Sequence, residues 1–497
     1  MGSIPADEPT VEEDHDILVI GAGLSGINTT HVLRAQMPHR SVAILEKRPV
    51  LGGTWNLFRY PGVRSDSYMT AFGLSWYPWP KRHKVAPAAE ILEYLGEAAD
   101  KDGITPLIRF SHEVKAFEWK SDEQKWRLDV DADGVRKTFV ANFIICAMGY
   151  YADDKALEAA IPGIDDFGGQ VVHTQWWPDD LDYPNKRIVL IGSGATAVTL
   201  LPELVKEASH VTMLQRSPSY VVASGRQTLV DQLADSLLPK TWASVVTRWY
   251  ATAIELVLSE LVLAFPNVFR KLLMKGARAA LPKRVDADVH FNPRYYPMEQ
   301  RLCLTPSGEF FKALHEDNCE IVTDTIETVT KDGVQLTSGM KLDAGIIVTA
   351  TGLYFQLFGG LKPVVDGEVL EIGSHYAWRG MLVDGLPNMA FIMGNATSSW
   401  TPGANLMAHL AVKLLKNMER KGAATVVPKI ERRDGMPAHL SVDAKSNYFV
   451  QAADRMPKAT GESPWYGRKN LAWDVWALLF GSMEDGLVYS GVKSKDI

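Results

Sequence analysis

Two short glycine-rich turns, each lying between an apolar run and a segment of helical character, constrain this chain more than any other feature. The first, GAGLSG, spans residues 21–26 and follows the apolar run at 15–20; the second, GSGATA, spans 192–197 and follows 186–191. A strand, a tight glycine turn and a helix in this order make the phosphate-binding part of a βαβ unit. We therefore expect an α/β protein with two Rossmann-like units, each holding one dinucleotide.

The first turn has the three glycines of a dinucleotide-binding motif. Gly21 permits the tight turn, Gly23 lets the backbone approach a pyrophosphate, and Gly26 lets the helix pack closely on the strand. Ser25 is placed to contact the pyrophosphate at the helix N-terminus. A second apolar run ends at Glu46, 20 residues after Gly26, where a carboxylate accepts hydrogen bonds from a ribose and excludes a 2′-phosphate. The first site is thus predicted to bind FAD or NAD and not NADP.

The second unit has a different residue at the position that contacts the ribose. A helix over 198–208 and a strand over 210–214 follow it, and this strand leads into Arg216 instead of an acid. A guanidinium forms bidentate contacts with phosphate, so the second site is predicted to bind NADP(H); the alternative is a solvated surface arginine. The residues expected at this site are Gly192, Ser193, Gly194, Ala195, Thr196, Ala197, Val198, Arg216 and Ser217.

The spacing of the motifs predicts that one unit is inserted into the other. Apolar runs at 141–149 and 345–352 each end in a glycine and would return the chain to a nucleotide-binding edge. The expected divisions are a disordered tail over 1–14, the first part of the FAD domain over 15–151, an NADP domain over 152–340 with a helical insertion at about 229–282, and the rest of the FAD domain with a C-terminal region over 341–497.

Composition excludes several other classes of protein. A net charge of −7 and a pI near 6.0 argue against nucleic acid as a partner, because phosphate backbones attract basic surfaces. The three cysteines are widely spaced, which argues against a disulfide oxidoreductase on a similar fold and suits a cytoplasmic protein. No metal site is assigned.

One segment raises the question of membrane contact. Residues 249–269 contain no lysine or arginine, but Glu255, Glu260 and Pro266 interrupt the apolar sequence and argue against a membrane span. A helix packed on the protein or resting on a membrane surface fits better. The basic stretch that follows, 270–278, leaves peripheral membrane contact through 249–278 open.

Two longer motifs carry a resemblance to a known family. The first is FxGxxxHxxxW followed by proline, met at Phe167, Gly169, His173, Trp177 and Pro178; the second is GGxWxxxx(F/Y)PGxxxD, met at Gly52, Gly53, Trp55, Tyr60, Pro61, Gly62 and Asp66. With these motifs the chain resembles the type I Baeyer–Villiger monooxygenases over residues 16–418, and among them the small ethionamide-activating branch. Trp177 favours this family over the related flavin-containing monooxygenases, whose motif ends in Tyr or Phe.

The resemblance implies an enzyme that uses NADPH, FAD and O₂ to oxygenate a small organic substrate. A C4a-peroxyflavin would attack a ketone to give an ester or lactone; S- or N-oxygenation of a heteroatom and a catalytically silent nucleotide-binding module are the alternatives. Because the peroxide and its adduct carry negative charge, the resemblance assigns a catalytic cation to Arg301, oriented by Asp66. A surface arginine and a helix cap are the plainer interpretations of these two residues.

The resemblance also implies further cofactor contacts. Gly53, Thr54, Trp55 and Asn56 would line the flavin, Arg64 and Ser65 would reach toward NADP, and Val114 would contact the adenine side. His173 is expected to link the two domains, or else to fill a packed corner between them. Substrate-pocket residues are expected from 229–282 and from the loop at 395–400.

Overall fold

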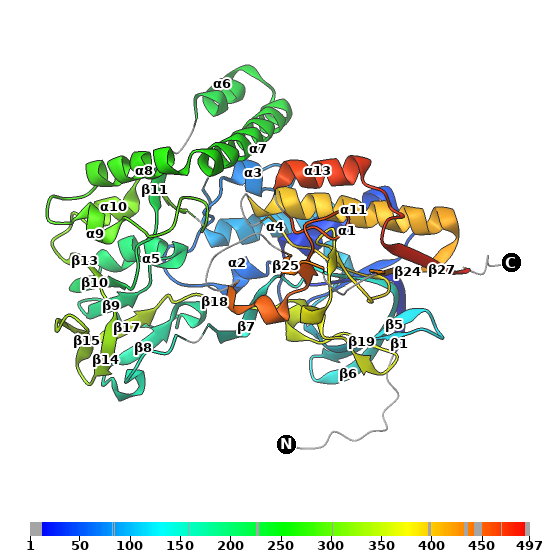
Figure 1. Cartoon of the computed structure of the whole chain (residues 1–497), viewed down its shortest axis with the longest axis horizontal. Helices are drawn as coiled ribbons and strands as arrows, with labels where there is room; N and C mark the ends of the chain where they lie inside the picture. The colour runs from blue at the N-terminus through cyan, green and yellow to red at the C-terminus, as the bar shows by residue number, and fades with distance from the viewer. Residues whose placement is uncertain are drawn as a thin grey trace.

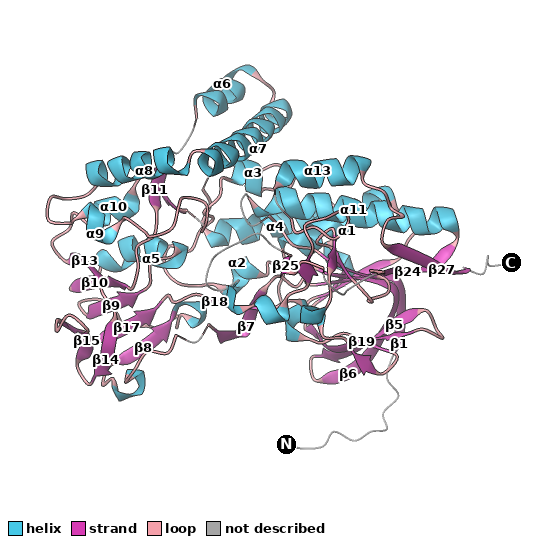
Figure 2. Ribbon diagram, viewed as in Figure 1, coloured by secondary structure: helices cyan, strands magenta, loops and turns pink. Residues whose placement is uncertain are grey.

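The computed structural model describes residues 12–81, 83, 85–157, 159–224, 228–300, 302–395, 399–431, 436–441, 450–468 and 470–492. Within these residues, two separate β-sheets carry the two glycine turns. Figures 1 and 2 show the sheets side by side, the first on the right and the second on the left, with helices packed over them. The predicted α/β class with two Rossmann-like units is confirmed.

The first sheet has nine strands in the order β20-β19-β4-β5-β6-β1-β2-β3, with β23 paired to β6. Their bounds are β1 Glu12–Ile20, β2 Val42–Leu45, β3 Ile108–Arg109, β4 His112–Lys120, β5 Lys125–Ala132, β6 Val135–Cys146, β19 Val364–Val365, β20 Glu368–Val369 and β23 Met389–Phe391. β1 runs parallel to both β2 and β6. Its central residues are fully buried, as expected for a parallel strand covered on both faces.

The second sheet has five parallel strands in the order β13-β10-β9-β17-β8. Their bounds are β8 Gln170–His173, β9 Arg187–Ile191, β10 His210–Gln215, β13 Cys319–Thr323 and β17 Ile346–Thr349. Buried aliphatic side chains from these strands form apolar cores on the two faces of the sheet.

Each glycine turn leads directly into a helix, α1 (Leu24–Gln36) after the first and α5 (Ala195–Val205) after the second. Both helices begin inside the motif, with Gly23 and Gly194 as their N-caps, so the second begins before residue 198, where the sequence predicted its start. The reason is that the phosphate-binding turn is itself the first turn of the helix, with its N–H groups left free.

The order of the strands shows the expected insertion. All strands of the second sheet fall between β6 and β19, and both of these belong to the first sheet. Two expected boundaries need correction. The second unit extends past residue 340, because β17 pairs with β8 and β9. The tail expected over 1–14 includes three residues that form the start of β1 on β6; residues 1–11 lie outside the described residues.

The C-terminal region, which has no recognisable motif, packs on the first unit. Helix α11 (Trp400–Lys421) lies on α1 and is followed by β24 (Ala423–Pro428), which pairs with β27 (Leu487–Val492). The Asn388 side chain donates to the carbonyl of Ala424 at 2.8 Å, and the Trp378 indole donates to that of Asp485 at 2.8 Å. These bonds tie the C-terminal region to the segment 378–388, which leads into β23 of the first sheet.

The helical insertion is present as α6 (Leu229–Leu237), α7 (Lys240–Ala264) and α8 (Pro266–Ala280). In Figure 1 these green helices lie along the top of the molecule. Among the described residues, no helix alone has the length and hydropathy to cross a membrane. The consecutive helices Trp242–Ala264 and Pro266–Ala280 meet that test only as a pair, and they are bent by 108° at Phe265.

Candidate functional site

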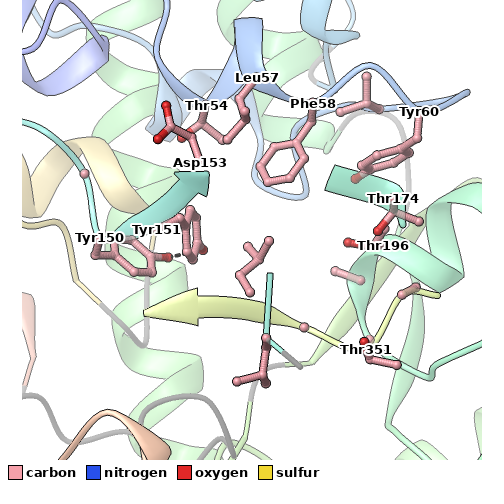
Figure 3. A pocket seen from close by; sticks show the side chains of 18 of the residues that line it. Thr54, Leu57, Phe58, Tyr60, Tyr150, Tyr151, Asp153, Thr174, Thr196 and Thr351 are labelled. Atoms are coloured by element: carbon pink, nitrogen blue, oxygen red, sulfur yellow. Dashed lines mark hydrogen bonds between the residues drawn. The ribbon is translucent and has the colours of Figure 1, made fainter. Parts of the chain in front are cut away.

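Both glycine turns line a single cavity of about 1160 Å³. Ile20 and Leu45 of the first sheet and Ile191 and Leu214 of the second all line it. These residues lie at the carboxyl ends of parallel strands, where open α/β sheets bind their ligands. Figure 3 shows side chains from both units around one open space, with Thr54, Leu57, Phe58 and Tyr60 on one side and Thr174, Thr196 and Thr351 on another.

The first turn has the close contacts that its glycines predict. Gly21 has φ +104° and donates its N–H to the carbonyl of Leu45 at 2.8 Å. A Cβ on Gly26 would lie 1.9 Å from the carbonyl oxygen of Gly21, so helix and turn can approach only because the side chain is missing. A Cβ on Gly23 would meet only Gly53, at 3.6 Å, and both of these glycines line the cavity. The first turn is therefore a narrow cradle open to a ligand.

Glu46 supports this cradle from its base. Its Oε2 accepts the N–H of Ala22 at 2.7 Å, its Oε1 accepts the N–H of Arg48 at 3.0 Å, and the side chain reaches the cavity although it is 5% exposed. A carboxylate has about four acceptor positions, so these two bonds leave capacity for ribose hydroxyls. The acid thus has a structural role that the sequence pattern did not reveal.

Aromatic side chains cover the first turn. The indole N–H of Trp400 donates to the Ser25 hydroxyl at 2.9 Å, and its ring stacks on Tyr150 with centroids 4.9 Å apart. Tyr151 in turn donates to the Tyr150 hydroxyl, as the dashed line in Figure 3 shows. The two tyrosines were missed in the sequence, although they directly follow the glycine-terminated run at 141–149. Together these rings give one end of the cavity an apolar wall.

The second turn also opens into the cavity. Gly192 has φ +143° and donates to the carbonyl of Leu214 at 2.9 Å, while a Cβ on it would lie 2.4 Å from the carbonyl oxygen of Ala350. A Cβ on Gly194 would meet nothing within 4 Å. Arg216 follows β10 at the cavity wall, is exposed, and forms no ion pair with the residues described. Its guanidinium is therefore available to an anionic ligand.

The segment after the first glycine pair bridges the two units. Arg64 Nη1 donates to Glu309 Oε2 at 2.7 Å, and its Nη2 is buried with no hydrogen-bond partner among the described residues. Tyr60 contacts Thr196 at the start of α5, and burial raises the pKa of the Tyr60 hydroxyl to about 12 despite this hydrogen bond. Asp66 lines the same cavity. Arg64 thus lines the cavity with a guanidinium whose hydrogen bonds are only partly satisfied, which suits an anionic ligand.

Not every predicted residue reaches the cavity. The predicted residues that line it are Gly21, Gly23, Ser25, Glu46, Gly53, Thr54, Trp55, Arg64, Asp66, Val114, Gly192, Ser193, Gly194, Ala195, Thr196, Arg216 and Ser217. The predicted residues that do not line it are Gly26, Asn56, Ser65, Ala197, Val198 and His173. Ser65 is 1% exposed and its hydroxyl bonds to the backbone of Ser67, so it shapes the bend before Asp66. Arg301 lies outside the described residues, while its neighbours Gln300 and Leu302 line the cavity.

His173 lies at the end of β8, beside the cavity but not on its wall. Its Nδ1 accepts the N–H of Gln175 at 3.1 Å, its Nε2 is buried without a partner among the described residues, and burial lowers the pKa of the imidazole. The adjacent Thr174 reaches the cavity. The histidine is therefore neutral near pH 7 and caps the short helix that begins at Thr174.

Comparisons with known proteins agree with this geometry. The flavin-binding monooxygenase-like family model matches residues 14–260. The FAD-containing monooxygenase EthA of Mycolicibacterium smegmatis is 41% identical over 477 residues, which is 95% of this chain and 96% of that protein. The chain belongs to the flavin-binding monooxygenase-like family. A probable FAD-binding monooxygenase AlmA of Acinetobacter baylyi is 38% identical to this flavin-binding monooxygenase, over 98% of each chain.

Solved structures show the same fold as this family member. An oxidized steroid monooxygenase bound to NADP superposes with a TM-score of 0.74 at 21% identity, covering 96% of this chain and 99% of that one. An open structure of cyclohexanone monooxygenase gives 0.73 at 19% identity, covering 96% and 100%. The resemblance to Baeyer–Villiger monooxygenases drawn from the sequence motifs is confirmed at the level of family and fold.

Proposed function

We propose that this flavin-binding monooxygenase holds FAD on the first glycine turn and NADPH on the second, and inserts one atom of O₂ into a small organic substrate. The observation that carries the proposal is that both turns open into one cavity. A nicotinamide and a flavin can therefore meet inside it, as hydride transfer between them requires. Oxygen insertion beside a ketone carbonyl is the first choice of reaction.

The residues around the first turn fit FAD. The cradle between Gly23 and Gly53 would be filled by any side chain, which suits the pyrophosphate of a dinucleotide, and the α1 N-terminus supplies free N–H groups. Glu46 would accept hydrogen bonds from the ribose, and Val114 at the start of β4, which also lines the cavity, would contact the adenine side. Trp55 and Thr54 would lie against the flavin ring.

The residues around the second turn fit NADPH. Gly194 leaves open space for the pyrophosphate, and Arg216 supplies the cation for a 2′-phosphate. Arg64 reaches into the cavity from the first unit with one N–H unsatisfied, so it would bind the nucleotide near the junction of the units. His173, which is neutral and precedes Thr174, would hold the end of β8 in place beside this junction.

When bound, the reduced flavin supplies electrons to O₂, and the protein must stabilise the negative charge that develops there. We assign this role to Arg301, with Asp66 orienting it, on the strength of the motifs; its neighbours Gln300 and Leu302 line the cavity. The stacked rings of Tyr150 and Trp400, which also line the cavity, would help to exclude water from it. Exclusion of water strengthens a charge–charge interaction and limits loss of the oxidant as hydrogen peroxide.

A second candidate is oxygenation of a sulfur or nitrogen atom on the same site. The relatives at 38–41% identity carry names that specify no ketone, whereas cyclohexanone monooxygenase matches at 19% identity. The silent-module alternative is set aside, because relatives that cover 95% or more of the chain are named as monooxygenases.

The test is product analysis under ¹⁸O₂ with purified FAD-loaded protein and NADPH. Phenylacetone and methyl phenyl sulfide serve as matched aromatic substrates for the two reactions. Incorporation of one ¹⁸O atom into an ester supports Baeyer–Villiger oxidation, and incorporation only into a sulfoxide supports heteroatom oxygenation. NADPH consumption that yields hydrogen peroxide and no oxygenated product from a broad ketone and sulfide panel would contradict both.

A further inference from the structure

The most exposed apolar side chains of this protein gather on four helices at one edge. Among the large apolar side chains that the structure describes, all those at least 61% exposed are Leu229, Leu237, Trp242, Trp249, Val268, Leu479 and Phe480. They belong to α6, α7, α8 and α13 (Leu471–Phe480). In Figure 1 these helices lie together along the top of the molecule. We call the surface they form the helical face. Such a concentration of exposed apolar groups marks an interaction site.

Helix α7 presents its apolar side outward. Trp242, Val246, Trp249, Val257 and Leu261 are 41–71% exposed and recur at nearly helical spacing. The side of α7 next to this stripe is anchored, because Ala243, Thr247 and Val262 are 2–4% exposed. The exposed stripe is therefore a stable feature of a packed helix.

The acidic groups of α7 are bound to the protein. Glu255 Oε1 accepts the N–H of Ser399 at 2.7 Å, and Glu260 Oε1 accepts the side-chain amide of Asn470 at 2.7 Å. The second bond also ties α7 to the start of α13. Glu255 is thus partly buried against the loop before Trp400, whereas Glu260 stays exposed next to Leu261.

Positive charge adjoins the apolar surface. Lys271 and Lys275 are exposed on α8, beside Val268 and Leu272, which are 61% and 59% exposed. The segments that carry the helical face, 229–280 and 471–480, together contain six basic and five acidic side chains, in a chain whose net charge is −7, so the positive charge is concentrated on α8. Exposed lysines next to an apolar stripe, as Lys271 and Lys275 are here, are typical of helices that lie in the interface of an anionic bilayer.

We propose that the helical face docks this monooxygenase on the surface of an anionic lipid bilayer. Two exposed tryptophans on α7 and two on α13, Trp473 and Trp476, suit the boundary between headgroups and acyl chains. The 108° bend between α7 and α8 fits helices that lie along a surface. A second copy of the chain is the alternative occupant, and the experiment below separates it from lipid by the oligomeric state.

The inner side of α7 connects this face to the cavity. Glu255 holds Ser399, which precedes the cavity residue Trp400, and Arg248 donates to the carbonyl of Gly73, which follows the cavity residue Phe72. A docked molecule would therefore place the apolar end of its cavity next to lipid, where apolar substrates concentrate. The docking itself does not depend on which reaction is proposed above.

The experiment is vesicle co-sedimentation of the full-length, FAD-loaded protein with neutral phosphatidylcholine vesicles and with vesicles containing phosphatidylglycerol. The parent should bind the anionic vesicles and bind them more weakly as salt rises. The double variant Trp249→Glu/Leu261→Glu should reduce binding by about tenfold or more, because two apolar side chains lose their burial. Lys271→Glu/Lys275→Glu should abolish the preference for anionic lipid.

A matched control is Val135→Glu/Val369→Glu, which changes two side chains of the first unit that are 58% and 51% exposed. This control should bind vesicles as the parent does, and all variants should retain FAD absorbance and the parental circular dichroism. The proposal would be overturned if the parent protein bound neither vesicle type. It would also be overturned if the α7 variant and the control bound vesicles equally. So would a dimer in sedimentation velocity that the α7 variant dissociates while the parent shows no vesicle binding.

Discussion

Arg64 and Glu309 form an ion pair between the two units, with Nη1 and Oε2 2.7 Å apart, and the second terminal nitrogen of Arg64 stays buried without a partner among the described residues. Arg64 lines the shared cavity, whereas Glu309 does not. Arg64 therefore links the two units and presents a guanidinium at the cavity wall.

The first prediction follows from this pair. Arg64→Ala should raise KM for NADPH by roughly tenfold, since one charge-assisted contact to the nucleotide is lost. Glu309→Gln is the matched control: it removes the ion pair and retains the guanidinium, so KM should not rise. Steady-state kinetics with saturating FAD measure KM for NADPH in both variants. Equal increases in the two variants would mean that the ion pair, and not a nucleotide contact, accounts for the effect.

The second prediction concerns nucleotide selectivity. Arg216→Ala should raise KM for NADPH by about 10- to 100-fold and leave KM for NADH nearly unchanged, because only NADPH carries the 2′-phosphate. Arg187→Ala removes an exposed arginine of the same sheet that does not line the cavity, and it should change neither value. Parallel losses with both nucleotides would refute the assignment of Arg216.

The third prediction separates two glycines of the first turn. Gly23→Val should fold but purify without the yellow flavin colour, because Gly23 has an ordinary φ of −77° and its side chain would enter the ligand cradle. Gly26→Ala should destabilise the fold itself, since its Cβ would lie 1.9 Å from the Gly21 carbonyl oxygen. Flavin absorbance and thermal unfolding distinguish the two effects. Full flavin content in Gly23→Val would show that the first turn is not the flavin site.

The fourth prediction tests the oxygenation step. Arg301→Ala should be reduced by NADPH at a rate near that of the parent, because nucleotide binding is assigned to other residues. Oxygenated product should fall by about 10²–10³, the usual effect of removing one preorganised charge partner, with hydrogen peroxide formed instead. Anaerobic stopped-flow spectroscopy measures the rate of reduction by NADPH, and product analysis in air measures the oxygenation. Unchanged product formation would remove Arg301 from the mechanism.

The fifth prediction concerns stability at acid pH. Burial lowers the pKa of His173 in the folded state below its ordinary value of 6.5. Below about pH 6.5 the unfolded chain then binds a proton that the folded chain does not, so the free energy of unfolding should decrease as the pH falls. His173→Asn should make this decrease smaller, by at most about 1.4 kcal/mol per pH unit. His39→Asn, at a mostly exposed histidine, is the control in denaturant titrations at pH 5–8. Identical pH profiles for parent and His173→Asn would contradict the prediction.

Local sequence patterns determined the two βαβ units, the insertion of one into the other and the opposite charge at Glu46 and Arg216. These features depend on glycine spacing and on apolar runs, whose consequences are confined to neighbouring residues. The long motifs likewise indicated the family, because each is a contiguous segment.

Tertiary structure alone decided which residues meet. Trp400 bonds to Ser25 and Arg64 pairs with Glu309 across long stretches of chain, and nothing near either residue in the sequence specifies its partner. It also decided that the Ser65 hydroxyl bonds to the backbone of Ser67. The outward direction of the apolar side chains of α7 and the contact of Glu255 with Ser399 were decided in the same way. Such outcomes depend on how whole helices and sheets pack, which is a property of the assembled core and not of local spacing.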